Sequence, residues 1–156
     1  MGGDWTDKRR EIAYTEARSV IDAQNATMTD IDDKAMRTVR LNAVLLGLLV
    51  TGVQFAPDLF RDPLLQAAFA LLIFSTVFGV ITYNESNLYV GPRGEYIEAL
   101  ADEEFSDPPW EDDLLETMAG MIAENYDDIR RNAHWLTATQ VALVLGIIAA
   151  VTAVAI

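Results

Sequence analysis

Hydrophobic and polar residues separate into blocks along the 156-residue chain instead of mixing throughout it. Three apolar runs fill residues 41–56, 64–83 and 136–156, and every acidic side chain lies outside them. A helix rises about 1.5 Å per residue and the hydrocarbon core of a bilayer is about 30 Å thick, so roughly twenty apolar residues cross it. The first run is shorter, and we expect Arg37 and Arg40 beside it to extend their side chains to the interface. The pattern predicts three transmembrane helices.

Residues 5–23 form an amphipathic pattern ahead of the first apolar run. Ala13, Ala17, Val20 and Ile21 follow the 3.6-residue period of a helix, and charged residues fill most of the other positions. Because this stripe fades at Ala23, we predict that the helix ends there and packs on the rest of the protein; a helix lying on the membrane surface is the alternative. Residues 25–28 are predicted to break it.

A second helix is predicted to begin at Thr29 and to continue into the first apolar run. Thr29 followed by Asp32 approximates a capping box, and Asp30 and Asp33 add negative charge near the positive end of the helix dipole. The same acidic cluster has the composition of a calcium ligand set, but it lacks the spaced positions and the glycine turn of a calcium loop. We therefore interpret the cluster as helix-end charge and predict no metal site.

The remaining segments complete an all-α membrane protein, a two-span hairpin plus a C-terminal span with cytosolic helical extensions. Pro57 and Pro63 bound a tight turn between the first two runs. Beyond the second run we expect a short helix at residues 95–102 and one long helix at about 109–156. The predicted parts are an N-terminal helix at 1–28, the hairpin at 29–83, a cytosolic helical insert at 84–135 and the third span at 136–156.

Basic residues flank the apolar runs unevenly. Residues 34–40 hold three basic side chains before the first run, Arg130 and Arg131 precede the third, and the turn at 57–63 holds only Arg61. Positive charge beside a span marks the cytoplasmic side of a membrane. The N-terminus and the insert are therefore predicted to be cytoplasmic and the C-terminus to lie outside the cell membrane. The polar N-terminal segment predicts no cleavable signal sequence.

Acidic residues outnumber basic residues 24 to 11, and the formal net charge is −13. Such a surface repels nucleic acid, so no nucleic-acid partner is expected. Excess acid, two lysines and no cysteine resemble a halophilic protein, because molar salt shortens the Debye length to about 3 Å and screens self-repulsion. An ordinary acidic, solvated surface is the alternative.

Candidate catalytic chemistry is absent from the sequence pattern. No cysteine is present and His134 is the single histidine, which argues against a disulfide framework, a His-based metal centre and a Ser-His-Asp triad. No glycine-rich phosphate loop or nucleophile elbow occurs. We therefore predict that the protein is not an enzyme and has no catalytic, cofactor-binding or metal site.

The polar residues inside the three runs are all non-ionisable. Proton pumps and transporters of charged substrates usually place acids or bases within the membrane, so neither function is expected. Asn42, Gln54 and Gln140 carry amides that need partners in lipid, and we expect them to face other helices. Hydrogen bonding between helices is one interpretation, and a weakly polar pore lining is the other.

Small residues recur at four-residue spacing in two of the runs. They are Ala138, Ala142, Gly146 and Ala150 in the third run, and Ser75 and Gly79 in the second. Small side chains let helix backbones approach closely. Packing within one subunit is the simplest interpretation. Three spans do not need two such faces, however, so one face is expected to contact a neighbouring subunit in a homo-oligomer.

The order of elements and a short motif together resemble a known family. Asp32, Lys34 and Ala35 match an Asp-x-Lys-small motif at the mouth of the first span, and a hairpin, a helical insert and a last span follow. This arrangement is similar to the Pycsar transmembrane antiphage effectors and the related SLATT proteins. The resemblance implies a multimeric membrane protein that compromises the membrane on a nucleotide second-messenger signal, with Asp32 and Lys34 in an intersubunit or helix-cap contact. The insert is too short for a typical cyclic-nucleotide-binding domain, so the sensor would be a separate protein.

The hypothesis from sequence is a homo-oligomeric membrane effector, active in antiviral defence, that perturbs or permeabilises the membrane on a partner or second-messenger signal. Membrane lipid and further copies of the chain are its predicted partners. An accessory or structural subunit of a larger membrane complex is one alternative, and a small-solute channel is another. An effector should be toxic when overproduced, an accessory subunit should co-purify with a partner, and a channel should give steady conductance without growth arrest.

Overall fold

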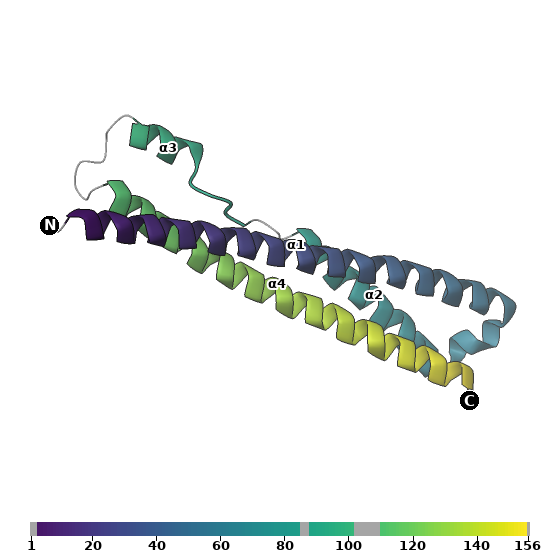
Figure 1. Cartoon of the computed structure of the whole chain (residues 1–156). Helices are drawn as coiled ribbons and strands as arrows, with labels where there is room; N and C mark the ends of the chain where they lie inside the picture. Colours follow the sequence, from purple (N-terminus) through teal and green to yellow (C-terminus); the bar gives the residue numbers. More distant parts are fainter. Residues whose placement is uncertain (1–2, 85–87, 102–109, 156) are drawn as a thin grey trace. The chain divides into compact units, whose positions relative to one another are not determined.

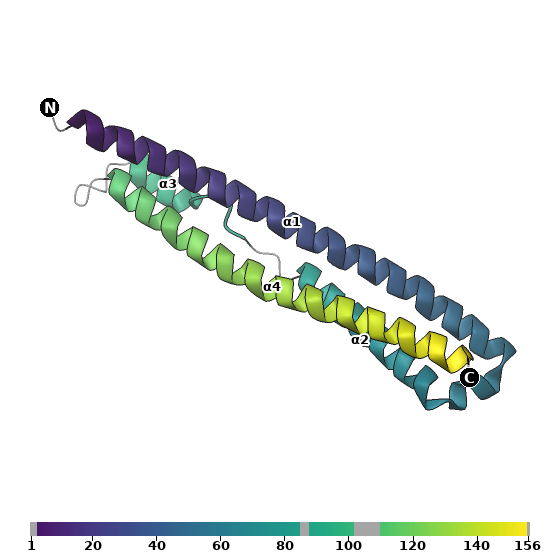
Figure 2. The same ribbon diagram turned by 60° about the horizontal axis from the view of Figure 1, so that its bottom comes forward.

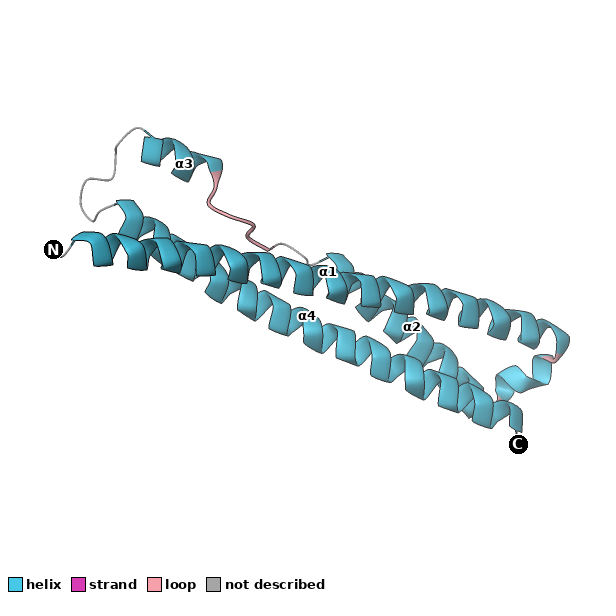
Figure 3. Cartoon of the chain, viewed as in Figure 1, coloured by secondary structure: helices cyan, strands magenta, loops and turns pink. Residues whose placement is uncertain are grey.

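The computed structural model describes residues 3–84, 88–101 and 110–155, and every regular element in these ranges is helical (Figure 3). The elements are α1 (Gly3–Phe55), the 3-10 helix η1 (Pro57–Arg61), α2 (Pro63–Asn84), α3 (Gly94–Ala101) and α4 (Trp110–Ala155) (Figure 1). Three of them are long and apolar enough to cross a membrane: α1 over Lys8–Phe55, α2 and α4. The predicted all-α class with three helices able to span a membrane is confirmed.

The chain divides into two compact units. Unit 1 comprises Met1–Met28 and Asn87–Arg130, and unit 2 comprises Thr29–Ser86 and Arg131–Ile156. The helices α1 and α4 each contribute one segment to both units, whereas α2 belongs to unit 2 and α3 to unit 1.

Unit 2 is a bundle of three helical segments. The short helix η1 reverses the chain, so α2 runs antiparallel to α1, and the α4 segment lies beside both (Figures 1 and 2). Asp62 caps α2, because its Oδ1 accepts a hydrogen bond of 2.7 Å from the backbone N–H of Leu64. Pro63 occupies the first helical position, where the missing N–H would have no helical partner. The predicted hairpin is therefore present, with a 3-10 helix as its turn.

The buried positions of these helices follow the spacing of a coiled coil. In α2 they alternate between three and four residues apart, and they are Leu65, Ala68, Leu72, Ser75, Gly79 and Thr82. In α4 a buried residue recurs at every seventh position, and these are Met118, Asn125, Asn132, Thr139, Gly146 and Ala153. In α1 the same interval joins Ile21, Met28, Ala35 and Asn42. A strict seven-residue repeat is typical of left-handed supercoiled helices.

The predicted break at residues 25–28 is wrong, because α1 continues through them. Thr27 Oγ1 donates to the carbonyl oxygen of Ala23 at 2.8 Å, which satisfies the hydroxyl within the helix. Gln24 Nε2 donates to the carbonyl oxygen of Ile122 at 2.9 Å, and Met28 is buried. Tertiary contacts therefore stabilise a segment that has weak helix propensity but no proline or glycine to end it.

The predicted helix start at Thr29 is also wrong, because α1 continues through this residue without a break. Asp30, Asp32 and Asp33 lie in the interior of α1, where no uncapped backbone N–H groups are available to them. Helix-end charge therefore does not explain this cluster. Asp33 instead lies 3.9 Å from Arg37, one helical turn later.

The outer surface of the spanning helices is apolar. Only 11% to 28% of the residues in their most apolar windows are buried inside the protein. Large side chains such as Leu48, Phe74 and Val154 are each more than half exposed. A water-soluble surface rarely carries so much contiguous apolar area, whereas a lipid-facing surface does.

Candidate functional site

A buried polar layer crosses the three helices of unit 2. Asn42 Nδ2 donates to Ser75 Oγ at 2.7 Å, and Ser75 Oγ donates to the carbonyl oxygen of Thr139 at 2.7 Å. All three residues are fully buried. Among the described residues none donates a hydrogen bond to Asn42 Oδ1, so one acceptor of the layer is unsatisfied. The expectation that Asn42 faces other helices is correct.

Gln54 and Gln140 are exposed in the single chain, so among its own helices the expectation holds only for Asn42, and contact of the other two amides with a helix of another chain stays a prediction. Gln140 follows the buried Thr139, and one residue is a rotation of about 100° around a helix. The amide therefore points away from the stripe that contacts α1 and α2.

Both predicted stripes of small residues lie inside unit 2. Ser75, Gly79, Ala142 and Gly146 are buried, and Ala138 and Ala150 are half-buried. A Cβ atom on Gly146 would lie 3.1 Å from the side chain of Leu72, and one on Gly79 would lie 2.6 Å from Val39 Cγ2. Helices of the same chain fill both faces, so neither face remains for a neighbouring subunit as the sequence argument required.

A third stripe of small residues, which the sequence reasoning missed, lies on the outer face of α1. Ala43, Gly47 and Thr51 recur at four-residue spacing and are exposed. A Cβ atom on Gly47 would meet nothing within 4 Å. The four-residue spacing was visible in the sequence. Only the packed bundle shows that this stripe is exposed whereas the stripes of α2 and α4 are buried.

The three residues of the predicted family motif differ in burial. Ala35 is fully buried, and its carbonyl oxygen would lie 3.5 Å from a Cβ atom on Gly79. The backbone of α1 at Ala35 therefore lies close to α2 at Gly79. Lys34 is exposed and Asp32 is half-buried. The helix-cap role of Asp32 and Lys34 is wrong, because both lie in the interior of α1.

Unit 1 holds an extended segment between the first halves of α1 and α4. Asn125 is fully buried and binds the backbone of Tyr89 twice, accepting from its N–H at 2.8 Å and donating to its carbonyl oxygen at 2.9 Å. Asn125 Nδ2 also donates to Gln24 Oε1 at 3.3 Å. Arg18 Nη1 donates to the carbonyl oxygen of Val90 at 3.1 Å. Side chains from both helices thus bind backbone groups of Tyr89 and Val90, which pair with no strand in the described part of the chain.

Two polar contacts join other elements of unit 1. Arg10 of α1 forms a two-pronged ion pair with Asp112 of α4, with nitrogen–oxygen distances of 3.0 and 2.8 Å. The Tyr96 hydroxyl of α3 donates to Asp113 of α4. Burial raises the pKa of the Tyr96 phenol above its ordinary value of 10.0, and the acceptor and negative charge of Asp113 raise this pKa further.

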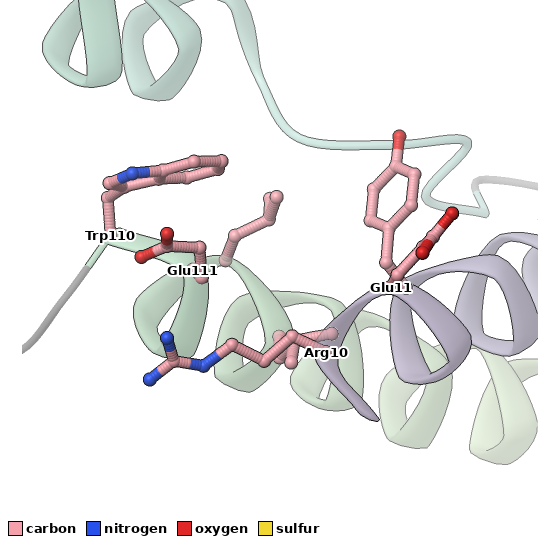
Figure 4. Close-up of a pocket in the computed structure, with 7 residues that line it drawn as sticks. Arg10, Glu11, Trp110 and Glu111 are labelled. Carbon is pink, nitrogen blue, oxygen red and sulfur yellow. The ribbon is translucent and has the colours of Figure 1, made fainter. Parts of the chain in front are cut away.

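The first halves of α1 and α4 also line an open cavity of about 470 Å³ (Figure 4). Its walls are Tyr14, Trp110, Leu114 and Leu115, and its charged residues are Arg10, Glu11 and Glu111. Trp110 is 49% exposed, so it belongs neither to the core nor to a closed aromatic cluster.

A second cavity, also of about 470 Å³, lies in unit 2. Its lining is entirely aliphatic and comes from α1, α2 and α4: Leu45, Leu48, Leu49, Leu72, Ile147, Ala150, Val151, Val154 and Ala155. A surface of this kind in a membrane-spanning segment is suited to contact with lipid acyl chains.

The described residues contain no group of three or more His, Cys, Asp or Glu side chains placed to hold a metal ion. The chain matches no known protein family, no curated protein and no solved structure. The features that bear on function are therefore the polar layer, the outer face of α1 and the open cavity of unit 1.

Proposed function

We propose that this protein is a homo-oligomeric membrane effector that perturbs or permeabilises the membrane when unit 1 receives a signal from a partner or second messenger. The observation that carries the proposal is the outer face of α1. Its small residues Ala43, Gly47 and Thr51 are exposed, and the space beyond Gly47 is open. Small residues at this spacing allow close approach of a second helix in lipid.

The packing inside unit 2 favours action between copies over action through one copy. Its interior positions are filled by side chains such as Leu65, Leu72 and Leu136. A water-filled path through a single bundle would have to displace them. The exposed Gln140 lies on a lipid-facing side of α4, where a second copy supplies the amide partner that hydrocarbon lacks.

Unit 1 is the signal-receiving part in this proposal. The basic residues beside the spans favour a cytoplasmic unit 1 and N-terminus, with the C-terminus outside. The short Asp32, Lys34 and Ala35 motif supports a role in antiviral defence, with a separate sensor protein supplying the signal. Lys34 is exposed and available for an intersubunit contact.

Inducible expression, combined with a membrane-potential dye and growth curves, tests this function. The wild-type protein should depolarise the membrane and arrest growth. Gly47→Leu should abolish both effects, because the leucine fills the outer face of α1. Gly52→Leu is the matched control, since Gly52 is equally open, lies in the same helix and points roughly 140° away around its axis. A harmless wild-type protein, or a Gly47→Leu variant as active as wild type, would contradict the proposal.

An accessory subunit of a larger membrane complex is the second candidate, and the open cavity of unit 1 favours it. Aromatic side chains exposed in a cavity are typical of a docking surface. This function predicts harmless expression and co-purification with one stable partner. The same expression experiment therefore separates the two candidates.

A further inference from the structure

The cavity of unit 1 lies at positions that continue the buried stripes of α1 and α4. Tyr14 is seven residues before Ile21, and Leu114 is four residues before Met118. Ile21 and Met118 are fully buried, yet Tyr14 is 45% exposed and Leu114 is only half-buried. In unit 2 a third helix, α2, covers the corresponding stripes. In the described part of unit 1 no side chain fills the space beside Tyr14 and Leu114, and an apolar cavity results.

The size and lining of the cavity suit one large apolar side chain and its neighbours. Its volume of about 470 Å³ falls within the range of roughly 300–1,000 Å³ typical of ligand pockets. Trp110 and Glu111 enter it from the start of α4, and Arg10 and Glu11 from α1 (Figure 4). Two aromatic rings and two leucines supply the walls, which is the composition of an anchor pocket at a protein interface.

The negative charge around the cavity favours a positively charged partner. Arg10 is engaged with Asp112 through two hydrogen bonds, so its charge is already neutralised. Glu11 and Glu111 form no ion pair with any described residue and leave the rim negative. A second copy of this chain, with its net charge of −13, would bring further negative charge to this rim. A cation beside the exposed faces of Trp110 and Tyr14 gains a favourable cation–π interaction as well as contact with the carboxylates.

We infer that this cavity is a docking site for a segment of a partner protein that places an aromatic side chain in the pocket and a lysine or arginine beside it. The site does not depend on the proposed effector activity or on the number of subunits. It binds a basic, aromatic-anchored peptide whether the membrane protein is an effector or an accessory subunit.

Three matched peptides test the inference on the full chain in nanodiscs, with 5-fluorotryptophan and fluorine NMR as the readout. The peptides are acetyl-Gly-Lys-Phe-Lys-Gly-amide, the same peptide with glutamates in place of lysines, and the same peptide with glycine in place of phenylalanine. The Trp110 signal is assigned with Trp110→Phe. The basic phenylalanine peptide should shift the Trp110 signal saturably and should leave the Trp135 signal unchanged, because Trp135 does not line the cavity. It should bind at least about fivefold more tightly than either of the other peptides.

A pair of variants checks that the rim acids supply the selectivity. Glu11→Gln combined with Glu111→Gln should weaken binding of the basic phenylalanine peptide by about fivefold and preserve the helical content. Glu116→Gln is the control, because Glu116 is exposed on α4 but does not line the cavity. Equal binding of all three peptides, equal binding of the acidic and basic phenylalanine peptides, or no shift at Trp110 would each overturn the inference.

Discussion

At the scale of single residues, the interior of this protein combines apolar packing with polar side chains at repeat positions. Asn125, Asn132 and Thr139 occupy successive seventh-residue positions of α4, and Asn42 occupies one in α1. Polar residues at core positions of a coiled coil favour one register, because a shifted register leaves them without partners. The layer of Asn42, Ser75 and Thr139 is therefore expected to align α1, α2 and α4.

The Asn42–Ser75 hydrogen bond should contribute measurably but modestly to stability. A double-mutant cycle with Asn42→Ala and Ser75→Ala should give a coupling energy of about 0.6 kcal/mol, the average for such pairs in membrane proteins. The unsatisfied Asn42 Oδ1 lowers the net contribution of Asn42 to stability, but this cost is present in both Asn42→Ala comparisons and cancels in the cycle. Unfolding in mixed micelles measures the coupling energy, and Asn84→Ala, at the exposed end of α2, serves as the control. Strictly additive effects of the two substitutions would show that the bond does not contribute.

Tyr96 gives unit 1 a pH-dependent contact. Its folded-state pKa is raised above 10.0, first by burial and then by Asp113, so protons are retained more strongly in the folded state. The associated stability is fully present below pH 10 and is lost as pH rises through the raised pKa. The difference in tyrosinate absorbance between wild type and Tyr96→Phe should show ionisation above pH 10, and Asp113→Asn should shift it downward. Ionisation at or below pH 10 in the wild type would contradict the burial of this phenol.

At the scale of elements, the spans were predictable because their length and lack of charge leave few alternatives. The α2 helix at Pro63–Asn84 and the α4 helix at Trp110–Ala155 agree closely with the expected ranges. The continuity of α1 through residues 25–28 was not predictable from local propensity, because the hydrogen bond from Gln24 to Ile122 and the burial of Met28 stabilise it. Buried residues recur every seven positions through this segment, at Ile21, Met28 and Ala35. A search for the 3.6-residue period of a single helix does not detect this repeat.

The candidate sites were less predictable than the helices. Residues at the cavity of unit 1 come from α1 and α4, nearly a hundred positions apart, and only the packed structure brings Tyr14 near Trp110. The small residues could be found by spacing alone, but their roles could not. Spacing does not distinguish Gly146, where an added Cβ atom would meet Leu72, from Gly47, where an added Cβ atom would meet nothing within 4 Å.

Gly146→Leu should destabilise the single chain, because the added atoms have no room beside Leu72 and the carbonyl oxygen of Ala68. Overpacking of this kind typically costs about 1–3 kcal/mol. Thermal unfolding followed by circular dichroism measures the effect. Gly120→Leu is the control, since a side chain at Gly120 meets nothing within 4 Å. An unchanged unfolding midpoint in Gly146→Leu would contradict the observed packing of α4 on α2.

At the scale of the whole molecule, charge and apolar surface are segregated. The spanning segments expose aliphatic and aromatic side chains, whereas the 24 acidic residues lie outside the apolar runs. This division fits a multi-pass membrane protein with an acidic, water-exposed unit. It also makes stability dependent on salt, because like charges repel across the acidic surface.

Unfolding in potassium chloride tests the predicted halophilic character. The thermal midpoint should rise between about 0.1 M and 1 M salt, because the Debye length falls from about 10 Å to about 3 Å over this range. Sucrose at matched osmolality is the control for solvent exclusion from the surface. A midpoint that falls as salt is added would indicate an ordinary acidic protein held by exposed ion pairs such as Arg10–Asp112.

Assembly through the outer face of α1 is the central claim at this scale. The most direct measurement is the number of subunits, determined by native mass spectrometry in mild detergent at high salt, for wild type, Gly47→Leu and Gly52→Leu. We predict a defined homo-oligomer for wild type and Gly52→Leu, and a monomer with unchanged helical content for Gly47→Leu. A monomeric wild type, or an oligomer of the same size in Gly47→Leu, would contradict the claim.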